Sequence, residues 1–139
     1  MTQYVTFQVA DCLYGLDVTH VQEVLPPQPR TPTPLAPAPV AGLVNLRGQV
    51  VLALDLRERL MLPPRDDVEP MIVVVRLGAQ TVSLLVDRIG EVVTAGPETF
   101  AEPPETLPLA MRQVVRGAHR LTDELLLVLD VQQVAGLTL

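Results

Sequence analysis

The sequence contains few aromatic residues, one cysteine and no lysine. Phe, Trp and Tyr make up 3% of the 139 residues, so the core must be built from aliphatic side chains. Aromatic surfaces on which the bases of single-stranded nucleic acid could stack are therefore not expected. Cys12 alone can form neither an internal disulfide nor a cysteine-based zinc site, which is typical of a protein from the reducing cytoplasm.

An excess of positive charge is also missing. The formal net charge is −6, and there is no basic cluster, which argues against binding to nucleic acid or to an anionic membrane surface. The first residues, MTQYVTFQVAD, lack the basic and then apolar pattern of a signal peptide. Aliphatic runs such as MIVVV and LLLVL are too short to span a bilayer, so no membrane insertion is expected.

Local signatures of catalysis are absent as well. The sequence has no nucleophile elbow, phosphate-binding loop, dinucleotide fingerprint or zinc motif. The two histidines lie far from any second metal ligand at helical spacing; His20 is predicted on the exposed face of a short helix and His119 beside a turn after Gly117. We therefore expect no enzyme, no cofactor and no metal site, and a binding module is the leading interpretation.

The pattern that is present is one of many short strands. Residues 4–11, YVTFQVAD, alternate between apolar and polar side chains, as a half-buried strand does, and residues 12–17 are its expected hairpin partner. Further strand pairs are expected over residues 42–56, with a turn at 48–49, over 71–87, with a turn at 78–79, and over 112–130. MIVVV and LLLVL are apolar at consecutive positions, which predicts strands covered on both faces and hence a barrel or sandwich.

Helices and loops are expected to be short. Asp17 is predicted to cap a helical segment over residues 18–25, and another helical turn is expected at 131–137. Seven of the fourteen residues from 26 to 39 are proline, which predicts a stiff, extended loop. Its PPQPR resembles a ligand of proline-recognition domains, but a rigid surface connection is the favoured interpretation.

Three aliphatic strands end in aspartate, in VLALDL, SLLVDR and LVLDV. Asp55, Asp87 and Asp130 are predicted to cap helical turns by accepting hydrogen bonds from free N–H groups. The alternative is that they converge as a metal or acid–base site.

Arg47 lies in an apolar hairpin, between Leu46 and Gly48, where an unpaired buried guanidinium would be costly. An arginine beside a glycine turn can reach back to a carboxylate, and Glu23 is a candidate partner. Arg47 could brace the hairpin or shape a recognition groove, and the residues alone favour neither role.

The stretch GLVNLRGQVVLALDLRERL, residues 42–60, resembles the signature of the CheW family of bacterial chemotaxis coupling proteins. That signature runs glycine, aliphatic residues, N-L-R-G, aliphatic residues and D-L-R. Three further stretches resemble the family in the same order, YGLDVTHVQEV at 14–24, VSLLVDRIGEVV at 82–93 and ELLLVLDVQQV at 124–134. The resemblance covers nearly the whole chain and implies one CheW-like domain over residues 1–139.

The resemblance implies a mainly β fold of two small SH3-like, five-stranded barrels packed on a shared core, with short helices. It implies an adaptor without chemistry of its own, which bridges the cytoplasmic tip of a methyl-accepting chemoreceptor and the regulatory domain of the histidine kinase CheA. Such a protein is cytoplasmic and is recruited to membrane-associated arrays, where it transmits the receptor state through differential contacts.

The same resemblance implies where the receptor binds. The groove between the barrels would take the helical tip of the receptor, as an apolar groove takes a helix. The positions that match are Val21, Glu23, Arg47 and Ile72, and those that shape the hairpin are Asn45, Leu46 and Gly48. The proline-rich loop at 26–39 departs from the more ordinary loop of relatives.

Three alternatives remain open from sequence. The chain could be a CheW-like adaptor of another chemosensory pathway, such as twitching motility through type IV pili or control of gene expression. It could be an aspartate-based metal-binding protein or enzyme that uses Asp55, Asp87 and Asp130. It could also be a generic barrel whose proline-rich segment is itself the ligand.

Overall fold

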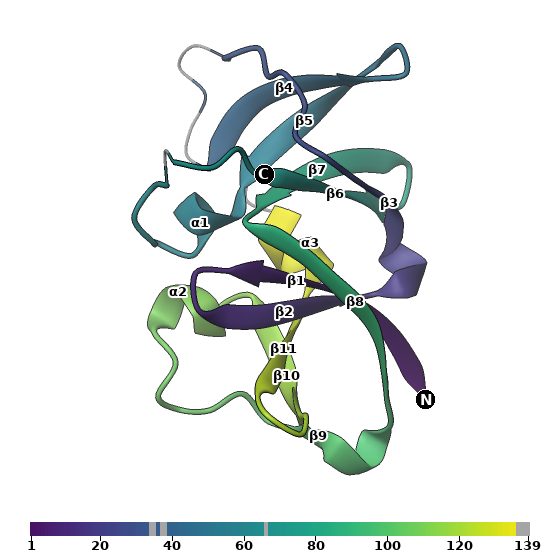
Figure 1. Ribbon diagram of the computed structural model, residues 1–139, viewed down its shortest axis with the longest axis vertical. Helices are drawn as coiled ribbons and strands as arrows, with labels where there is room; N and C mark the ends of the chain where they lie inside the picture. Colours follow the sequence, from purple (N-terminus) through teal and green to yellow (C-terminus); the bar gives the residue numbers. More distant parts are fainter. Residues whose placement is uncertain (34–35, 37–38, 66, 136–139) are drawn as a thin grey trace.

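The computed structural model describes residues 1–33, 36, 39–65 and 67–135. In this part of the chain eleven strands form two sheets, one of six strands and one of five, joined by short helices. The sheets lie one above the other in Figure 1, with the five-stranded sheet at the top. The predicted mainly β fold is confirmed.

The six-stranded sheet has the order β8-β1-β2-β11-β10-β9. Neighbouring strands are antiparallel except β2 and β11, which are parallel. The bounds are β1 Thr2–Val9, β2 Cys12–Asp17, β8 Arg88–Ala95, β9 Phe100–Ala101, β10 Val115–Arg120 and β11 Leu125–Leu129.

The five-stranded sheet has the order β3-β6-β7-β5-β4. Here β5 and β7 are the parallel pair, and the other neighbours are antiparallel. The bounds are β3 Val21–Leu25, β4 Val40–Leu46, β5 Gln49–Asp55, β6 Met71–Leu77 and β7 Gln80–Val86.

The two sheets repeat one pattern of pairing. Hairpin β1–β2 corresponds to hairpin β6–β7, parallel pair β2–β11 to β7–β5, and antiparallel pair β11–β10 to β5–β4. The two sheets exchange one edge strand each. β3 follows β2 of the six-stranded sheet in the chain but joins the five-stranded sheet, and β8 follows β7 of the five-stranded sheet but joins the six-stranded one. The five-stranded barrels stay a prediction, since the described pairing gives sheets of six and five strands with β8, β9, β3 and β4 at their edges.

The helices are short and begin at predicted caps in three cases. Their bounds are η1 Val18–His20, α1 Leu56–Arg59, η2 Pro97–Thr99, α2 Leu109–Arg112 and α3 Val131–Ala135. The side chains of Asp17, Asp55 and Asp130 each accept a hydrogen bond from a backbone N–H in the turn that follows, so these three caps are confirmed.

The helix predicted over residues 18–25 is wrong beyond His20. Val21–Leu25 form β3 instead, paired with β6, because the edge of a sheet offers hydrogen-bond partners and β-branched Val21 and Val24 fit a pleated surface. His20 is exposed, as predicted.

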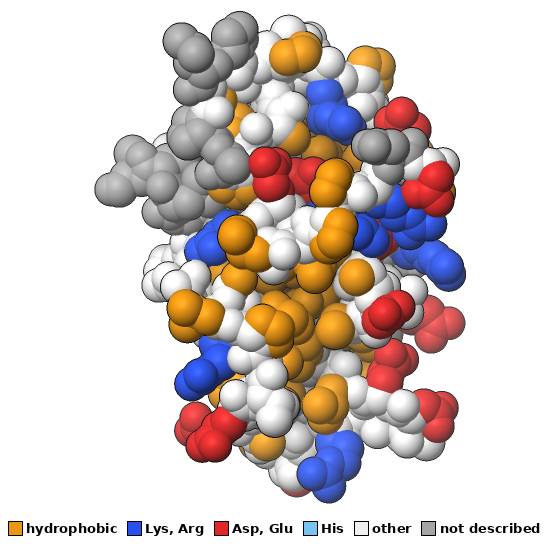
Figure 2. Space-filling view, turned by 90° about the vertical axis from the view of Figure 1, so that its left-hand side faces the viewer, with side chains coloured by type: hydrophobic (Ala, Val, Ile, Leu, Met, Phe, Trp, Pro, Cys, Tyr) orange, Lys and Arg blue, Asp and Glu red, His pale blue; other side chains and the backbone are white. Residues whose placement is uncertain are grey.

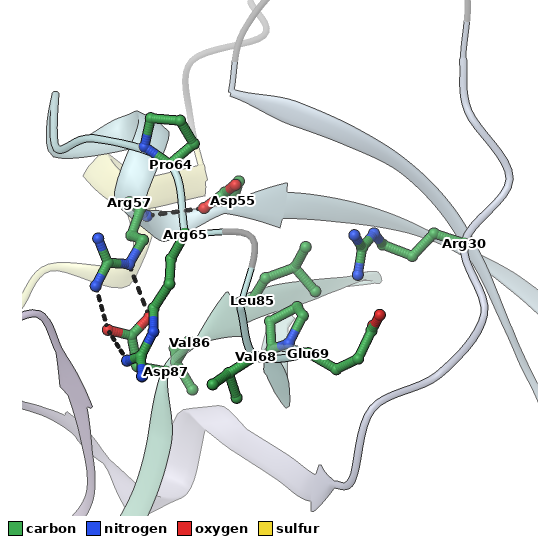
Figure 3. Close-up of a pocket in the computed structure, with 11 residues that line it drawn as sticks. Arg30, Asp55, Arg57, Pro64, Arg65, Val68, Glu69, Leu85, Val86 and Asp87 are labelled. Carbon is green, nitrogen blue, oxygen red and sulfur yellow. Dashed lines mark hydrogen bonds and ion pairs between the residues drawn. The ribbon is translucent and has the colours of Figure 1, made fainter.

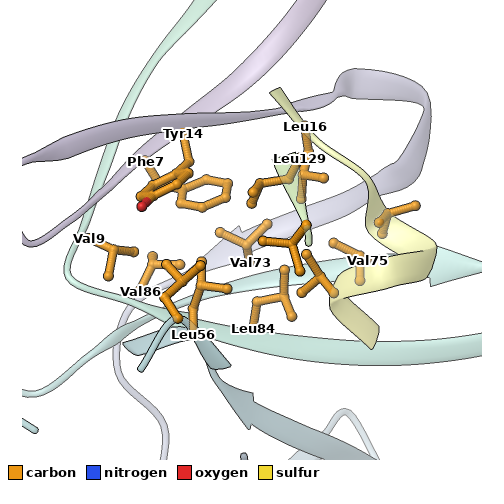
Figure 4. Packing of buried hydrophobic residues seen from close by; sticks show 14 of the residues in the cluster. Phe7, Val9, Tyr14, Leu16, Leu56, Val73, Val75, Leu84, Val86 and Leu129 are labelled. Carbon is orange, nitrogen blue, oxygen red and sulfur yellow. The ribbon is translucent and has the colours of Figure 1, made fainter. Parts of the chain in front are cut away.

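The main core is shared by the two sheets (Figure 4). It is aliphatic apart from Phe7 and Tyr14, whose rings stack with their centroids 6.3 Å apart. Ile72 to Val75 in β6 and Leu126 to Leu129 in β11 are buried at every position, so the predicted double coverage of these strands is confirmed. A smaller cluster of Val44, Ala53, Ile72, Val74 and Leu85 packs within the five-stranded sheet.

The proline-rich segment runs back along the edge of the five-stranded sheet. Thr31 pairs with Leu43 of β4 through two hydrogen bonds of 2.8 Å, Thr31 N to Leu43 O and Leu43 N to Thr31 O. Gly42 allows this approach, because its φ is +133° and a Cβ there would lie 2.5 Å from the carbonyl oxygen of Thr31. Residues 34, 35, 37 and 38 of the predicted loop lie outside the described residues.

Candidate binding surface

The turn between β4 and β5 consists of Arg47 and Gly48, not of Gly48 and Gln49 as predicted. Both residues have positive φ, +53° and +86°. A two-residue hairpin turn adopts such values because they match the right-handed twist of the two strands that it joins. The side chain of Asn45 accepts a hydrogen bond of 3.0 Å from the N–H of Gly48, which fixes the turn. Arg47 therefore projects from the end of the hairpin.

Arg47 forms a two-point ion pair with Glu23 of β3. Nη1 donates to Oε2 over 3.0 Å and Nη2 donates to Oε1 over 2.9 Å, which is the fork geometry of a guanidinium on a carboxylate. The Arg47 side chain is 77% exposed and that of Glu23 is 19% exposed. The apparent cost of an arginine in an apolar hairpin is thus absent, because the guanidinium lies at the surface and is paired.

This ion pair joins the two edges of the five-stranded sheet. β3 and β4 stand at opposite ends of the strand order, and the turn that carries Arg47 follows β4 directly. In Figure 1 the β4–β5 hairpin reaches over the sheet toward the side where β3 lies. The sheet is therefore curved enough for side chains to bridge its edges.

The other predicted residues divide between surface and interior. Asn45 and Gly48 are exposed, Leu46 is half-buried on the smaller cluster, and Val21 is half-buried against the main core. Ile72 is only 1% exposed and belongs to the smaller cluster, so it supports the surface from below and does not form it.

Val50 was not predicted as part of the site. It is 62% exposed and pairs with Asn45 across the hairpin, directly behind the turn. Alternation along β5 could have identified it, because Val51 and Ala53 are buried. We call Glu23, Asn45, Arg47 and Val50 the hairpin-tip surface.

A second ionic cluster surrounds Asp87, directly after β7 (Figure 3). Arg57 donates from Nε to Oδ1 over 2.9 Å and from Nη2 to Oδ2 over 2.7 Å, and the N–H of Ala10 donates to Oδ2 over 2.8 Å. Nη1 of Arg65 lies 3.6 Å from Oδ2. Asp87 was predicted to cap a helical turn, and that prediction is wrong: β8 follows it, and its carboxylate serves these three partners.

The Asp87 cluster is a brace between the two sheets. It joins α1, the end of β7 and the β1–β2 turn, and the Arg57 and Asp87 side chains are 16% and 9% exposed. Burial would raise the pKa of Asp87, but hydrogen bonds from Arg57 and Ala10 and the charges of both arginines bring it below its ordinary value. The carboxylate is therefore held ionised.

His119 is buried, 2% exposed, within β10, and does not lie beside a turn as predicted. Its Nε2 lies 3.1 Å from the hydroxyl of Tyr4 and its Nδ1 lies 2.8 Å from Oγ1 of Thr99. Thr99 Oγ1 donates to the carbonyl of Gly96, so it accepts from Nδ1–H, and Tyr4 donates to Nε2. Both ring nitrogens are satisfied by a neutral imidazole.

Within residues 1–33, 36, 39–65 and 67–135, no three His, Cys, Asp or Glu side chains lie together as metal ligands would. The described helices include none long and apolar enough to cross a membrane.

A face away from the hairpin tip carries exposed apolar side chains. Figure 2 shows hydrophobic side chains gathered in the middle of this face, with charged side chains around them. The elements on this side include α1 and α2 (Figure 1). Met61, just after α1, is 81% exposed and Leu109, in α2, is 70% exposed.

Comparison with known proteins gives one result throughout. Residues 3–137 match the model of the CheW-like domain. The chain is 29% identical over 136 residues to the chemotaxis protein CheW of Treponema pallidum, covering 94% of this chain and 80% of that protein. It is 28% identical over 131 residues to a probable chemotaxis protein CheW of Rhizobium etli, covering 94% and 84%.

The fold is likewise similar to a solved structure. The crystal structure of the scaffolding protein TtCheW from Thermoanaerobacter tengcongensis superposes with a TM-score of 0.82 at 28% identity, covering 93% of this chain and 88% of that one.

Proposed function

The chain belongs to the CheW family of chemotaxis scaffolding proteins, which are not enzymes, and on this premise we propose that it bridges two partners. One is the cytoplasmic tip of a methyl-accepting chemoreceptor, and the other is the regulatory domain of the histidine kinase CheA. The protein acts in the cytoplasm, at membrane-associated receptor arrays.

The observation that carries the proposal is the exposed pair of Arg47 and Glu23 at the hairpin tip. An exposed ion pair stabilises a fold by about 1 kcal/mol or less, so folding gives little reason for two charges in this geometry. A guanidinium that is 77% exposed can keep one hydrogen bond to Glu23 and donate another to a carboxylate of the receptor.

Apolar contacts would add to this polar one. A helical receptor tip that lies across the hairpin-tip surface would cover Val50 and the stem of Arg47, which are exposed in the free protein. Val21 and the buried Ile72 would set the position of β3 and β6 beneath the contact. Signalling then requires that the receptor make different contacts in its two states.

A bridge also requires a second surface for the kinase. The exposed apolar side chains Met61 and Leu109 belong to the segments of α1 and α2, which lie on the left of Figure 1, whereas the β4–β5 hairpin ends at the upper right. This separation supports the proposal that the receptor and the kinase bind different faces.

The test is a pair of binding titrations, against a receptor tip fragment and against the CheA regulatory domain of the same organism. Arg47→Ala should lose at least about tenfold in affinity for the receptor fragment, as expected when a charged hydrogen bond is removed. Binding of the kinase domain should be unchanged.

Arg88→Ala is the matched control, because Arg88 is exposed at the start of β8 and forms no ion pair within the described part of the chain. Equal receptor binding by wild type and Arg47→Ala would refute the proposal that the receptor binds the hairpin-tip surface. Failure of wild type to bind either partner would refute the bridging function.

A further inference from the structure

A pocket at the seam between the two sheets gathers three basic side chains. Arg76 comes from β6 of the five-stranded sheet, Arg116 from β10 of the six-stranded sheet, and His20 from η1 between β2 and β3. The cavity has a volume of about 170 Å³ and is separate from the hairpin-tip surface. Two of the ten arginines of this acidic chain therefore line one pocket.

The two arginines of this pocket form no close ion pair. In the part of the chain that the structure describes, no Asp or Glu oxygen lies within 4.0 Å of Arg76 or Arg116. Asp17 and Asp130 also line the pocket, but the Oδ1 atom of each caps a turn, accepting from Thr19 N and from Gln132 N. Hydrogen bonding from Thr19 is the main cause that holds the pKa of Asp17 below its ordinary value, and the charge of Arg116 adds to it without an ion pair within 4.0 Å.

The repeated pairing pattern identifies the counterpart of this pocket. Turn β6–β7 corresponds to turn β1–β2, so Gly78 corresponds to Ala10, and α3 after β11 corresponds to α1 after β5. The counterpart is therefore the pocket of Figure 3, where Asp87 receives hydrogen bonds from Arg57 and from the N–H of Ala10. There the chain itself supplies the carboxylate.

The equivalent carboxylate is missing from the seam pocket. Thr19 occupies the same position relative to β2 that Asp87 occupies relative to β7. At the counterpart of Asp87 the chain therefore has a threonine. Gly78 has φ +59°, and nothing lies within 4 Å of the position its Cβ would take, so the turn is open. The N–H of Gly78 is the counterpart of the N–H that Ala10 donates to Asp87.

We propose that this seam pocket binds a carboxylate that the chain does not supply, held by Arg76, Arg116 and the N–H of Gly78. The carboxylate comes from an acidic side chain of a docking protein or from a small free dicarboxylate. Two guanidinium groups and a backbone N–H suit an anion with oxygens spread in a plane, as the Asp87 cluster demonstrates within the same molecule. The site does not depend on receptor binding at the hairpin tip.

The experiment is an NMR titration that follows the arginine Nε–H signals of the full chain. One probe is glutarate, and the other is the amidated peptide acetyl-Gly-Glu-Val-Glu-Gly-NH₂, with its Gln-for-Glu version as the uncharged control. Binding should shift the Arg76 and Arg116 signals saturably. Arg76→Gln and Arg116→Gln should each weaken it by about tenfold or more, and Arg88→Gln should leave it unchanged.

Stronger binding of the Glu peptide than of glutarate supports the site and assigns it to a docking protein, whereas the reverse order supports it and assigns a free dicarboxylate. Absence of a saturable shift with either probe overturns the proposal, as does equal binding of the Gln peptide. Equal weakening by Arg88→Gln also overturns it, because the effect would then be one of overall charge. None of these results depends on whether the protein binds a receptor or a kinase.

Discussion

Arg47 and Glu23 lie 24 residues apart in sequence and join the opposite edges of one sheet through two hydrogen bonds of 3.0 and 2.9 Å. The backbone of Arg47 is in the left-handed region, at φ +53°, which is uncommon for a residue other than glycine. The turn thus presents the guanidinium and tolerates some strain. This relationship separates two roles for Arg47, bracing and recognition, that can be measured independently.

Exchange of the two charges should test that separation. In the double variant Glu23→Arg with Arg47→Glu, the ion pair can form again, so the free energy of unfolding should fall by less than about 1 kcal/mol. Binding of the receptor tip should be lost, because the exposed group at the turn is now acidic. Urea denaturation and the receptor titration measure the two effects, and retained receptor binding would contradict a role for Arg47 in recognition.

Removal of the Asp87 charge should be much more costly. Asp87→Asn leaves Arg57 partly buried without its carboxylate, so we expect a loss of about 2–4 kcal/mol in the free energy of unfolding, measured by urea denaturation. Asp67→Asn is the matched control, because Asp67 also pairs with an arginine but is 70% exposed. A loss as small as that of the control would show that Asp87 does not brace the sheets.

The same carboxylate should make stability depend on acid. Because the pKa of Asp87 is lowered in the folded protein, its contribution is fully present above the unfolded pKa, about 4, and is lost as the pH falls through the folded value. In Asp87→Asn the decline of stability below pH 4 should be shallower than in wild type. An identical pH dependence of the two proteins would contradict the assignment.

His119 should act in a higher pH range. Burial lowers its pKa, which the charge of Glu98 offsets only in part, so the folded protein takes up this proton less readily than the unfolded chain. Stability should therefore be unaffected above about pH 6.5 and decrease as the pH falls below it, where the unfolded state is protonated first. Protonation would also deprive the Tyr4 hydroxyl of its acceptor.

The measurement is the free energy of unfolding between pH 5 and 8, a window set by the ordinary histidine pKa of about 6.5. His119→Gln should remove much of the decline, whatever its effect at pH 8, while the exposed control His20→Gln should leave the decline in place. A decline of the same size in His119→Gln would assign it to another group.

The sequence allows the strands to be predicted better than the contacts between them. The apolar runs of β6 and β11 predict that these strands are buried, and Asp55 and Asp130 predict the helix caps. Both signals are local in the sequence. β3 was predicted as a helix, since the spacing of its valines fits both a helix and a strand. Only the pairing with β6, which the local sequence does not encode, makes it a strand. The resemblance to the family predicts the receptor-binding positions, but the burial of one of them, Ile72, depends on packing that no short stretch encodes.

Asp87 and His119 illustrate the second limit. Asp87 directly follows β7, but its partners Ala10 and Arg57 come from distant parts of the chain. The pairing of β8 with β1 brings Ala10 to it, and the parallel pairing of β5 with β7 brings Arg57. The partners of His119, Tyr4 and Thr99, lie 115 and 20 residues away in sequence. Long-range pairing of this kind leaves no local periodicity from which it could be predicted.

The approach of the proline-rich segment to β4 should depend on Gly42. A methyl group there would lie 2.5 Å from the carbonyl oxygen of Thr31, and the φ of +133° is strained for any other residue. Gly42→Ala should therefore lower the free energy of unfolding by about 2–3 kcal/mol in urea denaturation, and the amide protons of Thr31 and Leu43 should lose protection from hydrogen exchange.

Gly48→Ala is the control, because φ is also positive there, at +86°, but nothing lies within 4 Å of the added methyl group. Gly48→Ala should lower the free energy of unfolding by about 1 kcal/mol, from backbone strain alone, and leave hydrogen exchange at Thr31 unchanged. Equal losses in the two variants would show that backbone strain alone explains Gly42 and that the contact with Thr31 contributes nothing to stability.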